Sequence, residues 1–312
     1  MIRAYELTKK YGDNTVVQDL DFTVRPGTVT GFLGPNGAGK STTMRMLLGL
    51  DAPTRGRSTI GGRAYATHRA PLTEVGALLE ARSVHPGRTA FHHLMALAHT
   101  HGIPRDRVEH VLDLAGLGAV AHKRVKGFSL GMGQRLGIAA ALLGDPATLI
   151  LDEPVNGLDP EGVRWIRDLL RSLARQGRTV LVSSHLMSET ALTADHLIII
   201  GRGRLLADTT VAEFVAAAGD ASVKVVTPRA DALRALLTGP GIDITAYRGP
   251  SPTELEIRGT DAAHIGRTAA THSIPLYELT PRTASLEQAF MDLTQESVEY
   301  RITAPEPAGA PA

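Results

Sequence analysis

One short segment of the chain has the residue types and spacing of a site that holds phosphate groups. Residues 34–42 read GPNGAGKST, which fits the pattern G-x-x-x-x-G-K-[ST]. Glycines let backbone N–H groups surround an anion, and a helix that begins there adds the positive end of its dipole. Lys40 would supply a positive charge for the outer phosphates, and Ser41 a hydroxyl for Mg²⁺. The predicted phosphate-binding residues are Gly34, Pro35, Asn36, Gly37, Ala38, Gly39, Lys40, Ser41 and Thr42.

A second motif, LILDE at residues 149–153, is an apolar stretch that ends in two carboxylates. We expect Asp152 to lie at the carboxyl end of a buried strand and to face a metal through Ser41 and water. Glu153 could then polarise a water molecule for attack on a terminal phosphate. The phosphate loop strengthens this interpretation over that of an acidic turn, because the two motifs supply complementary parts of one reaction.

Two further segments follow in chain order. His185 comes directly after the apolar run TVLVSS, where a neutral imidazole could reach the terminal phosphate or orient Glu153. The residues NGLDP at 156–160 follow Glu153 and predict a turn before a helix. The histidines of the region 85–122 show no metal-binding spacing, so we do not expect them to hold a metal.

The elements that would position these residues alternate between strands and helices. Apolar, β-prone runs at 28–33, 148–151 and 179–183 predict strands, and 161–176 predicts a helix that ends at Gly177. The region from 86 to about 123 has helical periodicity. Alternating strands and helices favour an α/β fold with a parallel sheet.

The pattern changes near residues 216–220, where we expect a linker. Beyond it we predict a small α+β domain over 221–301 and a Pro/Ala-rich tail over 302–312. The predicted strands of this domain are 223–227, 242–247, 254–258 and 275–279, and the predicted helices are 231–238, 261–271 and 285–293.

Composition limits the possible partners. The chain has 312 residues, no cysteine, and 33 basic against 32 acidic side chains, so disulfides are excluded and general binding to nucleic acid is not expected. Its apolar runs are shorter than the roughly 20 residues that span a bilayer, and its first residues lack the apolar stretch of a signal peptide. Any role at a membrane would therefore depend on a partner chain.

In the order of these motifs, residues 1 to about 214 resemble the ATP-binding subunit of ABC transporters. The resemblance implies a P-loop ATPase core over 1–216, with a mixed sheet, flanking helices and a helical subdomain at about 86–145. It implies ATP and Mg²⁺ as cofactors, with Tyr11 stacked on adenine and His185 as the switch histidine. FSLGM at 128–132 stands where the family signature LSGGQ belongs. Through it, Ser129 and Gly131 would face the ATP of a second copy, and Asp159 would cross the dimer interface.

Some positions depart from the family pattern. Leu130 and Met132 replace a Gly and the Gln of the signature, and Glu80 stands where a Gln normally contacts Mg²⁺. A carboxylate at Glu80 can still bind Mg²⁺ or its water. These variants, together with the segment ASLEQAFMDLT at 284–294, resemble the branch of bacterial drug and peptide-antibiotic exporters.

The resemblance implies an ATP-hydrolysing subunit that forms a homodimer around two ATP molecules. It would drive export through a separate integral membrane permease, at the cytoplasmic face of the membrane. Two alternatives are a soluble ATPase of this type that acts on ribosomes or DNA, and a regulatory nucleotide-binding module without turnover. Against the first, the chain holds one set of motifs, and the stretch between Lys40 and Ser129 is too short for a long coiled-coil arm. Glu153 and His185 argue against the second.

Overall fold

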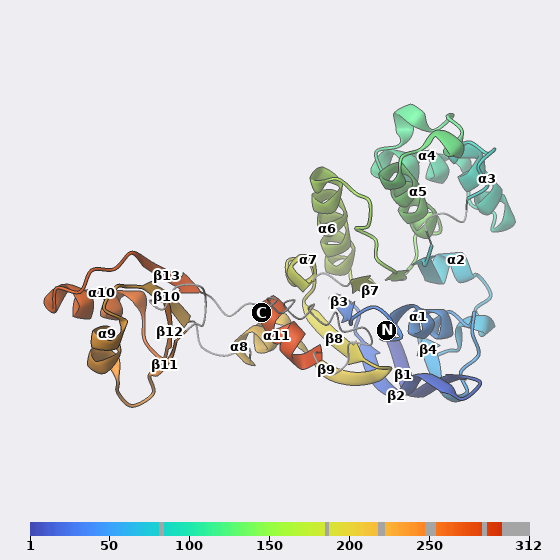
Figure 1. The fold of residues 1–312 in the computed structure, drawn as a ribbon. Coiled ribbons are helices and arrows are strands. Elements are labelled where there is room, and N and C mark those ends of the chain that lie inside the picture. The colour runs from blue at the N-terminus through green and yellow to red at the C-terminus, as the bar shows by residue number, and fades with distance from the viewer. Residues whose placement is uncertain (81–83, 185–186, 218–221, 247–253, 283–285, 295–312) are drawn as a thin grey trace, which may run out of the picture. The chain divides into compact units, whose positions relative to one another are not determined.

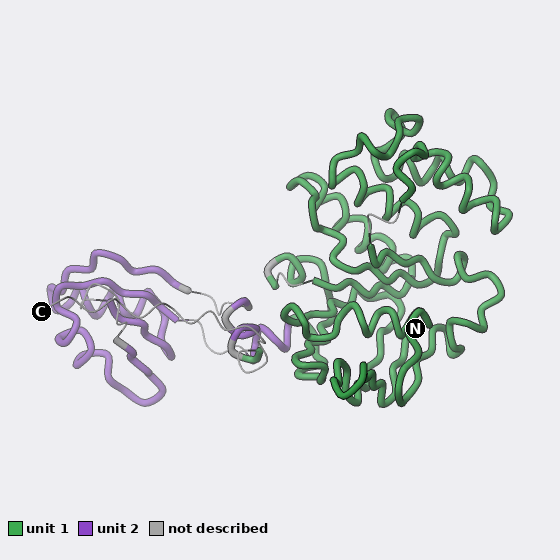
Figure 2. Tube along the Cα trace, turned by 45° about the vertical axis from the view of Figure 1, so that its right-hand side comes forward, with its two compact units in different colours: residues 1–211, 293–312 green, residues 212–292 purple. Residues whose placement is uncertain are grey.

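The computed structural model describes residues 1–80, 84–184, 187–217, 222–246, 254–282 and 286–294. The chain divides into two compact units, coloured separately in Figure 2. The first comprises residues 1–211 with the described residues from 293, and the second residues 212–292. The change of unit thus falls slightly before the linker expected at 216–220. No helix of the described ranges is long and apolar enough to cross a membrane.

A six-stranded sheet forms the centre of the first unit, in the order β5-β6-β7-β3-β8-β9. The first five strands of this order run parallel, and β9 pairs antiparallel with β8 at the edge. β3, β6, β7 and most of β8 are fully buried, as expected for strands covered on both faces. This confirms the α/β fold with a mixed sheet. The strands are β3 (Val29–Leu33), β5 (Val75–Leu78), β6 (Thr148–Leu151), β7 (Thr179–Ser184), β8 (His196–Gly201) and β9 (Arg204–Thr210).

A second, antiparallel sheet forms from the first strands of the chain, in the order β2-β1-β4. Its apolar side chains share one core with α1 and the central sheet, where the rings of Phe22 and Phe32 lie 5.7 Å apart. The core thus fixes the strand that leads into the phosphate loop. These elements are β1 (Ile2–Tyr11), β2 (Asn14–Val24), α1 (Lys40–Leu47) and β4 (Arg55–Ile60).

Three helices form a subdomain within the range expected at about 86–145, in the upper right of Figure 1. They are α3 (Ala90–Thr100), α4 (Arg105–Leu114) and α5 (Leu130–Leu142), preceded in the chain by α2 (Pro71–Glu74). α5 packs against β5, and small residues permit the close approach. A Cβ atom on Gly137 of α5 would lie 2.6 Å from Cδ1 of Leu78. The central sheet therefore sets the position of α5.

The segment after the acidic pair leads into α6 (Pro160–Arg175), which is followed by β7 and α7 (Met187–Ala191). Asp159 is the N-cap of α6, because its Oδ1 accepts a hydrogen bond of 2.8 Å from the backbone N–H of Gly162. Pro160 occupies the first helical position, where its missing N–H has no cost. The turn and helix predicted here are confirmed, with the helix starting one residue earlier.

The second unit contains the order β10-α9-β11-β12-α10-β13, with the strands arranged β11-β12-β10-β13 in one antiparallel sheet. This is the ferredoxin-like arrangement, and α9 and α10 share its apolar core. The elements from residue 211 onward are α8 (Val211–Ala217), β10 (Ser222–Val226), α9 (Ala230–Leu237), β11 (Asp243–Ala246), β12 (Glu254–Arg258), α10 (Ala262–Thr271), β13 (Glu278–Arg282) and α11 (Leu286–Thr294).

Most of the predicted elements agree with these bounds to within a residue or two, but the last strand does not. The prediction placed it at 275–279, whereas β13 spans Glu278–Arg282. Ile274 is buried in the core, and the carbonyl of Pro275 accepts a hydrogen bond from Thr227, so this stretch leads up to the strand. Pro281 is accommodated because β13 is an edge strand, where a missing N–H need not break a ladder.

Candidate nucleotide site

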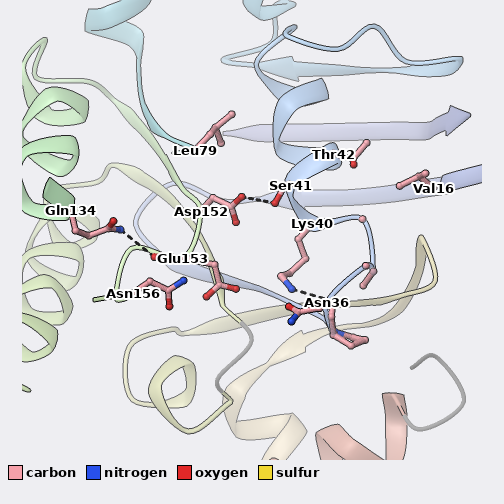
Figure 3. A pocket seen from close by; sticks show the side chains of 14 residues that line it. Val16, Asn36, Lys40, Ser41, Thr42, Leu79, Gln134, Asp152, Glu153 and Asn156 are labelled. Atoms are coloured by element: carbon pink, nitrogen blue, oxygen red, sulfur yellow. Dashed lines mark hydrogen bonds between the residues drawn. The ribbon is translucent and has the colours of Figure 1, made fainter. Parts of the chain in front are cut away.

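The two chemical motifs meet in one cavity of about 430 Å³ at the carboxyl ends of β3 and β6 (Figure 3). Ser41, at the start of α1, donates a hydrogen bond of 2.6 Å from Oγ to Oδ2 of Asp152. These residues are 111 positions apart in the chain and come together because β3 and β6 are parallel, with only β7 between them. The lining residues are Val16, Pro35, Asn36, Gly37, Ala38, Gly39, Lys40, Ser41, Thr42, Leu79, Gln134, Asp152, Glu153 and Asn156.

Glycine is required at two positions of the loop. Gly39 has a φ of 98°, and a Cβ atom there would lie 2.9 Å from the carbonyl oxygen of Val16. At Gly34, a Cβ atom would lie 2.5 Å from the carbonyl oxygen of Ile200. The loop is thus held tightly against β2 and β8, with its end at the N-terminus of α1. That is the geometry in which a helix start can bind an anion.

Lys40 is buried, and its ammonium group lies inside the curve of the loop. Its Nζ donates to the carbonyl oxygens of Gly34 at 2.6 Å and Pro35 at 3.2 Å. Burial lowers the pKa of Lys40 below its ordinary value, and the carboxylates of Glu153 and Asp152 oppose that shift. A poorly hydrated cation between these groups is well placed to receive the negative charge of a phosphate chain.

The acidic pair is held by contacts that the sequence did not reveal. Ser183, at the end of β7, donates from its hydroxyl to Asp152 and accepts a hydrogen bond of 2.9 Å from the backbone N–H of Glu153. Glu153 has a φ of 48°, a left-handed conformation that costs on the order of 1–3 kcal/mol for a residue with a side chain. The amide Nε2 of Gln134 donates to the carbonyl oxygen of Glu153 at 3.2 Å. The turn is therefore fixed on both sides.

Two predicted binding residues are not among the described residues that line the cavity. Tyr11, at the end of β1, is 49% exposed, and its hydroxyl donates to Asp51 at 3.2 Å. Lys9 places its ammonium group 4.8 Å from the centre of the Tyr11 ring. Glu80 is exposed and follows β5, while its neighbour Leu79 is the residue that lines the cavity. Their assignments to adenine and Mg²⁺ stay predictions.

The signature residues also lie outside the set that lines the cavity of their own chain. Ser129 caps α5, accepting from the N–H of Met132 at 3.2 Å, and its side chain is exposed. Gly131 approaches Gly157 so closely that a Cβ atom would lie 2.7 Å from the Gly157 carbonyl oxygen. Asp159 is exposed as well. Their assignments to a site shared with a second copy stay predictions, and His185 lies outside the described residues.

The sequence missed several residues of this site. Val16, Leu79, Gln134 and Asn156 line the cavity, and Ser183 supports both carboxylate-bearing residues. Asn156 follows Glu153 closely, and Gln134 continues the signature into α5, so both could have been suspected from position. Nothing in the local pattern around Ser183 indicates contact with the acidic pair, because that contact depends on β6 and β7 being neighbours.

Comparison with known proteins agrees with this geometry. The sequence model of the ABC transporter family matches residues 17–156. An uncharacterized ABC transporter ATP-binding protein of Bacillus subtilis, YhcH, is 36% identical over 296 residues, which cover 94% of this chain and 95% of the relative. The chain belongs to the ATP-binding proteins of ABC transporters. A second sequence model, of a domain of unknown function, matches residues 221–287.

Other relatives of this ABC transporter protein extend the comparison. The bacitracin transport ATP-binding protein BcrA of Bacillus licheniformis is 44% identical over 209 residues, 66% of this chain and 68% of the relative. A solved ATP-binding subunit of an ABC transporter superposes with a TM-score of 0.63 at 27% identity, covering 69% of this chain and 91% of that one. The chain is therefore an ABC ATPase, and the transporter role is favoured over the alternative of a ribosome- or DNA-acting ATPase.

Proposed function

We propose that two copies of this protein close around two ATP molecules and thereby drive export through a separate integral membrane permease. The subunit would work at the cytoplasmic face of the membrane, and no nucleic acid partner is expected. The similarity to a bacitracin transport protein and to lantibiotic transport proteins supports a peptide antibiotic or a related drug as the exported substrate.

The single observation that carries this proposal is the contact between Ser41 and Asp152, with Lys40 and Glu153 in the same cavity. A hydroxyl and a carboxylate oxygen in contact are hard oxygen ligands of the kind that Mg²⁺ prefers, so the residues present fit this ion. Ser41 and Asp152 would hold it, and Glu80, which follows the cavity-lining residue Leu79 in the chain, is a further candidate. When bound, the ion would neutralise charge on the phosphates.

The chain's own residues would then divide the work at each site. Lys40 and the backbone of residues 34–42 would bind the β- and γ-phosphates, and Tyr11 would stack on adenine. Glu153 would accept the proton of the attacking water, and His185 would contact the γ-phosphate. Ser129, Gly131 and Asp159 of the second copy would complete the site, and their exposure is consistent with this.

Such an arrangement makes ATP part of the dimer interface. To change the ratio of closed to open dimers from 1:99 to 99:1, the phosphate contacts must favour the closed dimer by about 5.5 kcal/mol. Charge-assisted hydrogen bonds from both copies to one γ-phosphate are of a strength that can supply this. Hydrolysis removes those contacts and would reopen the dimer.

The decisive test is Glu153→Gln, which keeps the size of the side chain but removes its basicity. We expect ATP binding to be retained, a dimer that persists in ATP on size exclusion, and phosphate release slowed by about 10²–10⁴-fold. Glu161→Gln, an exposed change in the first turn of α6, serves as the control and should hydrolyse ATP normally. Wild-type turnover in Glu153→Gln would refute the assignment.

The transport role needs a second experiment. We expect the gene beside this one to encode a multi-helix membrane protein, and co-expression of the two to protect cells from a panel of bacitracin-like and lantibiotic peptides. Glu153→Gln should abolish that protection at unchanged expression. Protection that persists in Glu153→Gln, or no protection against any member of the panel, would count against peptide export.

A further inference from the structure

We propose that Gln134 is a positioning residue that makes the placement of Glu153 depend on the signature helix α5. The inference rests on the proposed role of Glu153 as general base. Gln134 is 4% exposed and donates from its side-chain amide to the backbone carbonyl oxygen of Glu153 at 3.2 Å, as Figure 3 shows. The amide group therefore contacts the peptide that follows Glu153. Because this group is uncharged, it adds no charge that would attract the phosphates.

The backbone of Glu153 needs such support because its conformation is strained. A φ of 48° places a residue with a side chain in a sparsely populated region, which persists only when its surroundings fix it. Ser183 fixes the N–H side of the residue from β7, and Gln134 fixes the C=O side from α5. Loss of either contact would let the turn relax and move the carboxylate.

The contacts of Ser183 and Gln134 with Glu153 come from different parts of the fold. Ser183 belongs to the central sheet, whereas Gln134 lies about one turn into α5, the helix that begins at Leu130 with Ser129 as its cap. The position of the signature residues and that of Gln134 are thus set by one rigid helix. A helix shift that moves Ser129 toward or away from a second copy also moves the donor that holds Glu153.

Further contacts join α5 to the segment after Glu153. A Cβ atom on Gly157 would lie 2.4 Å from the side chain of Leu130, so the residue that replaces the signature glycine packs directly on this segment. Arg135 brings its guanidinium 4.0 Å from Asp159. Together with the Gln134 contact, they tie α5 to both ends of the segment from Glu153 to Asp159. The geometry points to a mechanical link between signature placement and the base.

The test replaces Gln134 by Met, which has a similar length but no hydrogen-bond donor. A misplacement of about 1 Å in a catalytic group can cost up to 10²-fold in rate, and we expect kcat for ATP hydrolysis to fall about 10-fold. The dissociation constant for ATP should change by less than about twofold, since Gln134 acts through the base. Ile138→Val, a small change at another buried position of α5, is the matched control and should leave kcat near wild type.

A double-mutant cycle separates positioning from a structural role. If Gln134 works through Glu153, Gln134→Met should lower the residual rate of Glu153→Gln by less than about twofold, because coupled residues are not additive. An equal loss in both backgrounds, or wild-type kcat in Gln134→Met, would overturn the inference. If Gln134→Met does not fold, Gln134→Asn, which withdraws the amide by one methylene, must show the same pattern. Full turnover in Glu153→Gln would instead refute the base assignment itself.

Discussion

Gly76, in the middle of β5, determines how closely α5 can approach the central sheet. A Cβ atom at this position would lie 1.9 Å from the carbonyl oxygen of Ala141 and 2.8 Å from Cγ of Pro146. Its φ is not in the left-handed region, so the backbone would accept alanine. The obstacle to Gly76→Ala is therefore space alone, and the atom in the way belongs to the backbone of α5.

The size of the effect follows from these distances. Contacts below 3.0 Å are essentially absent for real Cβ atoms, so α5 must move about 1 Å from β5. Overpacking of this kind costs roughly 1–3 kcal/mol, and a backbone obstacle cannot be relieved by a rotamer change. Gln134 lies two helical turns before Ala141, on the same side of α5. The shift should therefore also disturb the contact with Glu153 and lower kcat, by as much as about 10²-fold.

The chain provides its own probe for this experiment. Trp165 is the single tryptophan, and its indole N–H donates to the carbonyl of Leu114 at 3.0 Å while Arg135 stacks 4.8 Å from its ring. Its fluorescence therefore reports on contacts between α6 and the helical subdomain. We expect a urea midpoint for Gly76→Ala lowered by the equivalent of about 2 kcal/mol, together with the loss of kcat.

Gly133→Ala supplies the control. Gly133 lies on the same helix, and a Cβ atom there would meet no atom within 4 Å, so alanine should be neutral or should stabilise the helix by up to about 1 kcal/mol. If Gly76→Ala unfolds at the wild-type urea concentration and hydrolyses ATP at the wild-type rate, α5 is not held by this contact. That result would refute the reasoning.

Two further predictions concern residues that we propose bind the nucleotide. Burial lowers the pKa of Lys40 below 10.5, so its charge opposes folding near neutral pH, and this penalty is lost as the pH rises through the folded-state pKa toward 10.5. The unfolding free energy of Lys40→Met minus that of wild type should therefore fall over this alkaline range, measured by denaturant titration; a pH-independent difference would contradict the shift. Tyr11→Ala should weaken ATP binding by about 1–3 kcal/mol, the usual contribution of a base stacked on an aromatic ring. Tyr11→Phe should bind ATP like wild type in an equilibrium titration with ATP, and equal affinity of the Ala and Phe variants would exclude stacking.

Much of the site could be predicted because its chemistry is local. The phosphate loop and the pair Asp152 and Glu153 each lie on a few consecutive residues, next to strands whose apolar runs are unmistakable.

The strand predicted at 275–279 was placed wrongly because the prediction used the local pattern of apolar residues alone. Its apolar residues signal burial, but the hydrogen-bond ladder with β10 begins only at Glu278, and a pattern of burial does not show where pairing starts.

The contacts that hold Glu153 in place could not be predicted from the sequence. Gln134 and Ser183 meet Glu153 from two elements that are 19 and 30 positions away in the chain. Neither position carries a local pattern that distinguishes it from an ordinary polar residue, since the contact exists only once β6, β7 and α5 have packed. The close approach of α5 to β5 at Gly76 likewise depends on packing, although the glycine itself is visible in the sequence.

The sequence by itself determined which chemistry is available: a phosphate loop, two carboxylates and a fold that brings strand ends together. It could do so because backbone geometry requires particular residues at particular spacings, as Gly39 with its φ of 98° illustrates. Only the tertiary structure decided how that chemistry is held. The left-handed turn at Glu153 is maintained by side chains from other elements, because local interactions alone do not favour it.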